Sequence, residues 1–271
     1  MSIQKPTCRY SHLVTSFCCA LVIVAAMGIA SVGAADWGTL KGRFVVDGDV
    51  GEPAAITANK DPEYCGKQNL VDQAIVVGDD GALANVFVYL YLKRGKSVDI
   101  HPDLETADSE PVVLNNKGCR FEPHAMVLRT GQTLQIHNSD PVAHNTNFTP
   151  TKNPGFNQIV PNDSPLSKTF EKRESYPSPA ACNIHPWMKG FVLIRDNPYM
   201  TLSAADGSFE IANLPAGKHE FIFWHEAKGN LKNLAFEGGK TSKKGRAKLT
   251  ITAGETLDLG EIKVKPALLG K

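Results

Sequence analysis

Residues 182–188 read CNIHPWM and place a thiol, an imidazole and a thioether within one short stretch. Cys182, His185 and Met188 follow one another at intervals of three residues. In an extended strand such side chains would alternate between faces and spread over roughly 20 Å. Pro186 fixes its own backbone and restricts His185, which favours a tight loop. Such a loop would bring the three side chains to one point, where a metal ion is the natural occupant.

The chemistry of these three side chains narrows the choice of metal. A thiolate, neutral imidazoles and a weak, long thioether contact are typical of a type 1 (blue) copper site. Zinc accepts Cys and His but has no use for the thioether, and a closed zinc site usually needs paired Cys or His elsewhere. The sequence contains no C-x-x-C or H-x-x-x-H pair. We therefore predict a single copper ion.

A copper site of this kind needs a second histidine on a neighbouring strand. His144, in DPVAHNTNF (140–148), precedes Cys182 by 38 residues, which leaves room for a loop and two strands. The predicted ligands are His144, Cys182 and His185, with Met188 as the axial ligand. In this role Cys182 would be a thiolate with a strongly lowered pKa.

The sequence from residue 36 onward is typical of a β protein. Short runs rich in Val, Ile, Phe and Tyr alternate with Gly, Pro, Asn and Asp, and clear helical periodicity is almost absent. The regular spacing favours β-sandwiches. The expected strands are 40–46, 85–92, 124–130, 133–138, 167–172, 189–195, 208–214, 219–226, 248–253 and 257–264.

Two stretches together resemble the cupredoxin family: GCRFEPHAMVLRTGQTLQIHNSDPVAHNTNF (118–148) and CNIHPWMKGFV (182–192). The short Cys-x-x-His-Pro-aromatic-Met-x-Gly loop is most similar to that of the amicyanins. The resemblance covers about 85 residues, 112–196. It implies a Greek-key sandwich, the four ligands named above, and a role for Asn145 in tying the two ligand loops together. In the family an aromatic-rich strand leads into the Cys, whereas here Pro177 and Pro179 stand before it, so we expect this strand to be irregular or at an edge.

The flanking segments resemble a different family, the carboxypeptidase regulatory-like domain, which is a prealbumin-like β-sandwich. The similar phrases are G-x-L-x-G-x-F (38–44), ADGSFEIANLPAGKHEF (205–221) and T-A-G-E-T (252–256). We expect residues 36–111 and 197–271 to form one discontinuous sandwich with residues 112–196 inserted in it. The alternative is a tandem of an N-terminal β segment and two separate domains. Residues 228–248 are basic and Gly-rich, which indicates a solvated hairpin loop.

Residues 1–35 have the pattern of an export signal, with a basic start, an apolar run (17–30) and small residues near Ala34. An uncleaved anchor helix is the alternative. We expect a periplasmic or otherwise extracytoplasmic protein with no membrane span after removal of the signal. The remaining chain has 27 basic and 28 acidic residues, a balance that favours neither nucleic acid nor an anionic membrane.

Three of the six cysteines lie in the expected signal, so an odd number remains in an oxidising compartment. Cys182 belongs to the metal motif. Cys65 and Cys119 are then the candidate disulfide pair.

The expected function is that of a one-electron carrier, not an enzyme, which serves a redox partner protein docked over Pro186 and Trp187. In this scheme His185 is the ligand expected to reach the surface. Other hypotheses for the function remain open: a copper-binding or carbohydrate-binding scaffold module, an oxidase or reductase subunit, a sandwich without copper, or a nucleophilic Cys182. His124 and His137 read as surface or core-edge residues, and residues 224–226 (WHE) could form a second site.

Overall fold

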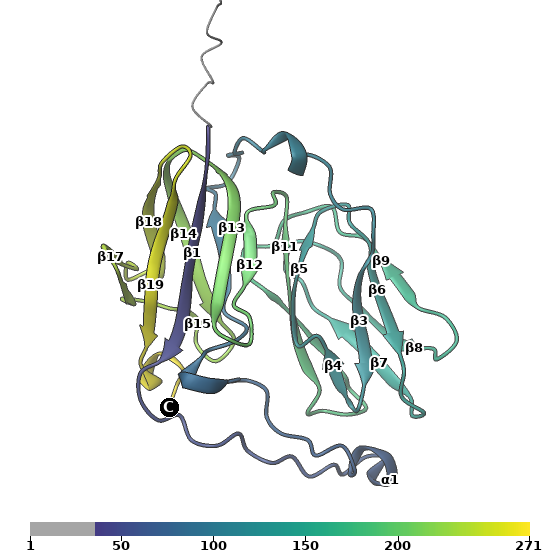
Figure 1. The fold of residues 1–271 in the computed structure, drawn as a ribbon. Helices are drawn as coiled ribbons and strands as arrows, with labels where there is room; N and C mark the ends of the chain where they lie inside the picture. The colour runs from purple at the N-terminus through teal and green to yellow at the C-terminus, as the bar shows by residue number, and fades with distance from the viewer. Residues whose placement is uncertain (1–35) are drawn as a thin grey trace, which may run out of the picture. The chain divides into compact units, whose positions relative to one another are not determined.

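The first strand of the fold lies at the centre of a three-stranded sheet. In the computed structural model, which describes residues 36–271, β1 (Trp37–Val46) runs antiparallel to β13 (Ser208–Pro215) and parallel to β19 (Thr256–Val264). Segments from the two ends of the described chain therefore share one sheet (Figure 1). The expected signal in residues 1–35 lies outside the described residues.

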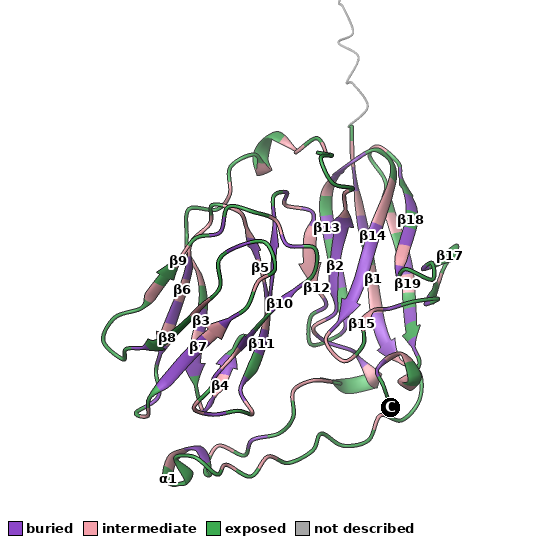
Figure 2. Cartoon of the chain, turned by 180° about the vertical axis from the view of Figure 1, so that it is seen from behind, coloured by how far each residue is buried: buried purple, intermediate pink, exposed green. Residues whose placement is uncertain are grey.

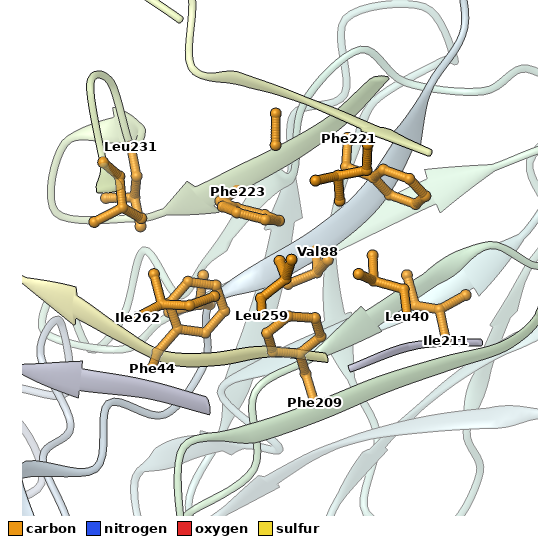
Figure 3. Packing of buried hydrophobic residues seen from close by; sticks show 14 of the residues in the cluster. Leu40, Phe44, Val88, Phe209, Ile211, Phe221, Phe223, Leu231, Leu259 and Ile262 are labelled. Carbon is orange, nitrogen blue, oxygen red and sulfur yellow. The ribbon is translucent and has the colours of Figure 1, made fainter. Parts of the chain in front are cut away.

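A second sheet packs on the first to complete what we call the outer sandwich. Its core contains Leu40, Phe44, Phe221 and Phe223, all fully buried (Figure 3). The strands of this sheet are β2 (Phe87–Tyr91), β12 (Met200–Leu202), β14 (Gly217–His225), β15 (Gly229–Asn230) and β18 (Arg246–Ile251). Residues 228–248 contain a hairpin, formed by β16 (Ala235–Phe236) and β17 (Gly239–Lys240). This segment is less solvated than expected, because Leu231 and Leu234 are buried.

The inner sandwich is formed by two further sheets that enclose their own apolar core, including Phe121, Leu128, Ile136 and Ile194. Each of the two sheets contains one pair of parallel neighbouring strands. One sheet has the order β4 (Arg120–Glu122), β3 (Val112–Lys117), β6 (Leu134–Asn138), β9 (Leu166–Lys168). The other has the order β5 (Ala125–Arg129), β11 (Lys189–Arg195), β10 (Ser178–Ala181), β7 (His144–Phe148), β8 (Phe156–Val160). The predicted all-β class is confirmed.

The strand that leads into Cys182 is β10, and it lies between β11 and β7 rather than at an edge. Proline is tolerated there because the ladder to β7 is short. Only Ala180 and Ala181 pair with β7, whereas Pro179 stands beyond that ladder and uses its carbonyl to accept a bond from the Thr149 N–H.

The two sandwiches contact each other through the facing sheets that contain β2 and β11. Phe87, Tyr89, Leu193 and Trp224 form an apolar cluster across this contact. Arg195 is 4% exposed and donates to the Leu90 carbonyl of β2 (2.9 Å) and to the Glu174 carbonyl of the inner sandwich (2.8 Å). The two terminal nitrogens of the planar guanidinium therefore each bond a different sandwich.

A long connection between β1 and β2 leaves the outer sandwich and crosses to the inner one (Figures 1 and 2). We call residues 54–74 of it the strap. Its two limbs pair at Ala55 and Val71, and its tip carries the short helix α1 (Pro62–Cys65). The remaining short helices are η1 (Asp79–Gly81), η2 (Pro102–Leu104) and η3 (Pro266–Leu268). Within residues 36–271 no helix is long and apolar enough to cross a membrane.

Replacing Arg195 with Lys should lower the free energy of unfolding by about 1–3 kcal/mol, because an ammonium cannot bond both carbonyls in the same way. The control is Arg43→Lys, which alters an exposed pair with Glu261 and should cost less than about 1 kcal/mol. Urea unfolding measures both. Equal losses in the two variants would contradict the bridging role of Arg195.

Glu174 gives the fold a pH dependence. Burial alone would raise its pKa, but hydrogen bonds from Thr151, Lys152 and Asn153 lower it. A lowered folded-state pKa stabilises the fold above the unfolded value of about 4.3, and this contribution is lost as the pH falls through the folded value.

We expect Glu174→Gln to be less stable than the parent at pH 7 and to lose less further stability on acidification. Urea midpoints between pH 7 and pH 3 provide the measurement. Glu63→Gln is the control, since the Glu63 side chain is 96% exposed. An unchanged acid dependence in Glu174→Gln would refute this assignment.

Candidate metal centre

Three donor atoms converge at one buried point of the inner sandwich. Cys182 Sγ lies 3.9 Å from His144 Nδ1 and 3.8 Å from His185 Nδ1, and the two nitrogens are 3.0 Å apart. The three residues are at most 2% exposed. Two nitrogens bound to one ion at about 2.1 Å lie no more than about 4.2 Å apart, and a nitrogen and a sulfur bound at about 2.3 Å no more than about 4.4 Å. The three side chains can therefore bind one ion together.

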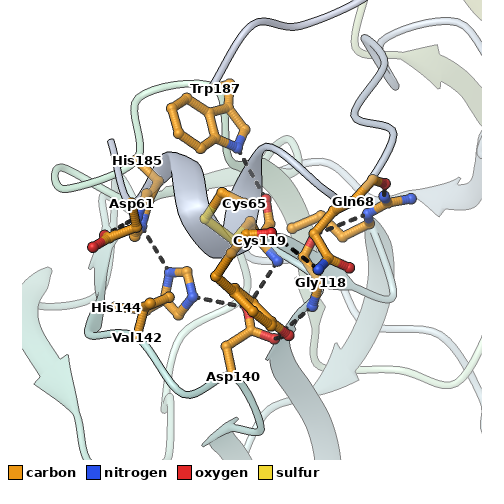
Figure 4. Close-up of a disulfide and its surroundings, with 12 residues drawn as sticks. Asp61, Cys65, Gln68, Gly118, Cys119, Asp140, Val142, His144, His185 and Trp187 are labelled. Carbon is orange, nitrogen blue, oxygen red and sulfur yellow. Dashed lines mark hydrogen bonds and ion pairs between the residues drawn. A yellow bond between two sulfur atoms is a disulfide. The ribbon is translucent and has the colours of Figure 1, made fainter. Parts of the chain in front are cut away.

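Both imidazoles are held so that their Nδ1 atoms face the thiol. His144 Nε2 lies 2.9 Å from Asp140 Oδ2, and His185 Nε2 lies 2.7 Å from Asp61 Oδ2 (Figure 4). Carboxylates accept hydrogen bonds, so these contacts place the ring proton of each neutral imidazole on Nε2. Each Nδ1 then presents a lone pair to the other and to Cys182, an arrangement that a bound cation stabilises.

The ligand loop has the tight conformation that its sequence favours. Cys182 and Met188 close it, with the Cys182 N–H donating to the Met188 carbonyl (3.2 Å) and the Met188 N–H to the His185 carbonyl (2.9 Å). Met188 is 1% exposed and belongs to the same apolar cluster as Cys182. The residues present thus comprise one thiol, two imidazoles and a buried thioether, the donor set of a type 1 copper site.

Asn145 connects the two segments that carry the ligands. Its Oδ1 accepts hydrogen bonds from the backbone N–H groups of Asn183 (2.8 Å) and Ile184 (3.2 Å), and it lies 3.3 Å from Cys182 Sγ. Its Nδ2 donates to Asn157 Oδ1 (2.6 Å) on β8. The side chain therefore fixes the ligand loop against β7.

The electrostatics of the site favour a negative sulfur. Burial alone would raise the pKa of Cys182, but the contact with the His144 ring and hydrogen bonds from nearby N–H groups lower it. Burial alone would lower the pKa of His144, but Asp140 and Cys182 raise it to about 8. Burial also lowers the pKa of His185.

Asp140 is buried beneath the site and joins it to the disulfide. It accepts hydrogen bonds from the Gly118 N–H (2.6 Å), the Cys119 N–H (2.7 Å) and the Tyr64 hydroxyl (2.8 Å). Burial alone would raise its pKa, but these donors and His144 lower it. Asp140 and Cys119 also lie near His144 as a second group of metal-ligand type, but the Cys119 sulfur is bonded to Cys65.

The strap covers the site from the outside. Cys65 at its tip forms a disulfide with Cys119, and Cys65, Leu70 and Cys119 form a small apolar cluster with Trp187 packed against it. Trp187 Nε1 donates to the Cys119 carbonyl (3.0 Å). The expectation that His185 reaches the surface is wrong, because Asp61 and the strap leave its side chain fully buried.

Sequence reasoning missed the two carboxylates. A signal existed for each: Asp140 stands four residues before His144, and Asp61 four residues before the disulfide residue Cys65. The spacing alone gives no direction to the side chains. For Asp61 the essential information is that the strap folds back over the ligand loop.

The other histidines do not join the site. His124 bonds Glu226 at the contact between the sandwiches, and burial followed by the charge of His124 lowers the pKa of the neighbouring His225 to about 4. His219 bonds the Pro215 carbonyl (2.7 Å), and His137 lies 3.4 Å from Gln135 Oε1. Within residues 36–271, no group of three metal-ligand side chains includes any of these four histidines.

No family model matches the chain, and no curated protein matches it either. Among solved structures, a copper-containing nitrite reductase from Thermus scotoductus aligns at 20% identity and a TM-score of 0.29, over 39% of this chain and 25% of the reductase. An amicyanin mutant aligns at 21% identity and 0.28, over 33% of this chain and 86% of the amicyanin. A purple cupredoxin from Nitrosopumilus maritimus aligns at 20% identity and 0.26, over 30% and 97%. This chain thus spans only a quarter of the nitrite reductase.

Removing the disulfide with Cys65→Ala and Cys119→Ala should lower the free energy of unfolding by about 2–5 kcal/mol, because the bond closes a loop of 54 residues. Without the disulfide the strap should no longer be held over the site, and Cys182 should become accessible to alkylation in the folded, metal-free protein. Mass spectrometry after iodoacetamide treatment tests accessibility. If Cys182 stays protected in the double variant, the strap is not what shields the site.

Proposed function

We propose that this protein holds one copper ion as a type 1 centre and transfers single electrons to a redox partner protein outside the cytoplasm. The observation that carries the proposal is the convergence of His144 Nδ1, His185 Nδ1 and Cys182 Sγ within 3.9 Å of one another. Met188 would supply a weak thioether contact. Copper bound there would supply reversible one-electron chemistry.

The chain's own residues would keep the site rigid and dry. Asp61 and Asp140 hold the two rings, and Asn145 holds the loop, so these donors need little movement when the charge of the site changes. The strap excludes water from His185. A preorganised, desolvated donor set of this kind favours fast electron transfer and offers no open position for a substrate, so we propose a carrier rather than an enzyme.

Trp187 is the proposed connection between the buried site and a partner. Its ring centroid lies 5.2 Å from that of His185, and it is partly exposed. Pro186 and Trp187 both line a pocket of about 250 Å³ beside the ligand loop. This keeps the expected docking face but moves the point of exit from His185 to Trp187.

The cover over His185 favours a second candidate function, in which the protein holds copper without passing electrons. Such a site would be slow to exchange electrons with any partner. Rapid oxidation and reduction of the copper form by small soluble redox dyes in stopped-flow measurements would favour the carrier, and slow exchange would favour the holding function.

The proposal is tested first by Cu(II) titration of the purified protein. We expect one equivalent to bind and to produce an intense visible band from copper–thiolate charge transfer. The band should vanish in Cys182→Ser and change in Met188→Leu, and it should persist in the control His137→Gln. The absence of any such band in the parent protein would rule out a type 1 centre.

Asp61→Asn should raise the reduction potential of the copper form. The carboxylate makes the His185 ring a better donor, which stabilises the more highly charged oxidised ion, and an amide does this less well. A tenfold change in the relative affinity for the two oxidation states corresponds to about 59 mV. Glu63→Gln removes the same charge two residues away without touching the ring, and a similar shift there would show a nonspecific charge effect.

A further inference from the structure

A basic cleft of about 1290 Å³ lies between the two sandwiches, and none of the four metal-site residues lines it. One wall comes from the outer sandwich, with Tyr91, Arg94 and Lys244 among its residues. The other comes from the inner sandwich, with Lys172 and Tyr176. Small-molecule pockets are usually about 300–1,000 Å³, so the size of the cleft favours a segment of an extended ligand.

The charge of the cleft differs sharply from that of the chain. Ten cationic and two anionic side chains line it, whereas the chain from residue 36 onward is nearly balanced. Seven of these cations are exposed, and within residues 36–271 none of the seven forms an ion pair. They are Arg94, Lys96, Lys152, Lys172, Lys232, Lys243 and Lys244. Clustered like charges repel each other, and a bound polyanion would relieve this repulsion.

The cleft is preformed because hydrogen bonds and an ion pair tie its two walls together. Arg195 at its base joins Leu90 to Glu174. Arg173 donates to the Lys93 carbonyl (3.0 Å) and the Lys96 carbonyl (3.2 Å) and pairs with Asp196 (3.0 Å). A ligand would therefore bind without first ordering the walls, which favours affinity.

The aromatic side chains of the cleft indicate which polyanion fits. Tyr176 is 53% exposed and lies among the lysines, whereas Arg246 covers the ring of Tyr91 at 3.6 Å. Proteins that bind single-stranded nucleic acid stack successive bases on several aromatic rings, and here only one ring is free among the residues lining the cleft. One free ring among many cations suits a chain of charged sugars, with one sugar ring on the tyrosine.

We propose that this cleft binds a segment of an acidic polysaccharide, whose anionic groups pair with the rim lysines and of which one sugar ring stacks on Tyr176. The metal centre has no part in this binding. The protein would thereby attach its copper site to an anionic glycan surface.

Binding of polygalacturonate to the purified protein, measured by calorimetry at several salt concentrations, tests the proposal, with dextran and an oligothymidylate as comparison probes. We expect polygalacturonate to bind, dextran not to bind, and oligothymidylate to bind more weakly. The triple variant Lys232→Gln, Lys243→Gln, Lys244→Gln should bind at least about tenfold more weakly at low salt. Because its binding should release up to about three fewer counterions, its affinity should fall less steeply as the salt concentration rises.

The matched control removes three exposed lysines that lie outside the cleft, with Lys218→Gln, Lys248→Gln and Lys263→Gln. Tyr176→Ala should weaken binding without changing its salt dependence. Equal affinities in the two triple variants, tighter binding of oligothymidylate, or no binding of polygalacturonate would each overturn the proposal. Because Cys182→Ser should bind polygalacturonate normally, a failure of the copper assignment and a failure of this proposal can be distinguished.

Discussion

The disulfide between Cys65 and Cys119 is the constraint on which the candidate metal centre depends most. The connection between β1 and β2 is about 40 residues long and has little secondary structure of its own, and such a loop is costly to order. The disulfide and the apolar cluster around it fix the tip of this loop against the inner sandwich. Only then can Asp61, on an otherwise distant segment, meet the ring of His185.

The same constraint explains why so many polar groups can be buried at one end of the inner sandwich. Burying a polar group is costly unless it is hydrogen-bonded. Asp140 meets this condition with four donors, of which one comes from the strap, two from the disulfide turn and one from the ligand His144. The bonds around Asp140 therefore join the strap, the disulfide and the candidate ligand His144 in one network.

The predictable features were those with regular apolar patterns or a distinctive local motif. The all-β class and most long strands follow from alternating Val, Ile and Phe, and the loop at Cys182 follows from its proline. No apolar pattern marks β7, because His144, Asn145 and Thr146 are buried polar residues where a strand normally buries apolar ones, and only the metal motif placed His144 on a strand. The candidate site thus breaks the pattern by which strands are recognised. The position of Asp61 depends on contacts across 124 residues, which no local pattern encodes.

The strap over His185 has two opposite effects: it protects the imidazole from water, and it keeps a partner protein away from it. A buried His185 is shielded from water and held by the Asp61 carboxylate, which restricts the orientation of its ring. For the proposed carrier, the same cover would block the shortest route from the imidazole to the surface of a redox partner. Trp187 offers a way round the cover, because it contacts the ring of His185, bonds the Cys119 carbonyl and is still partly exposed. In the proposed carrier, the residue that helps to hold the strap in place would therefore also be the one that keeps the covered site in electronic contact with its surroundings.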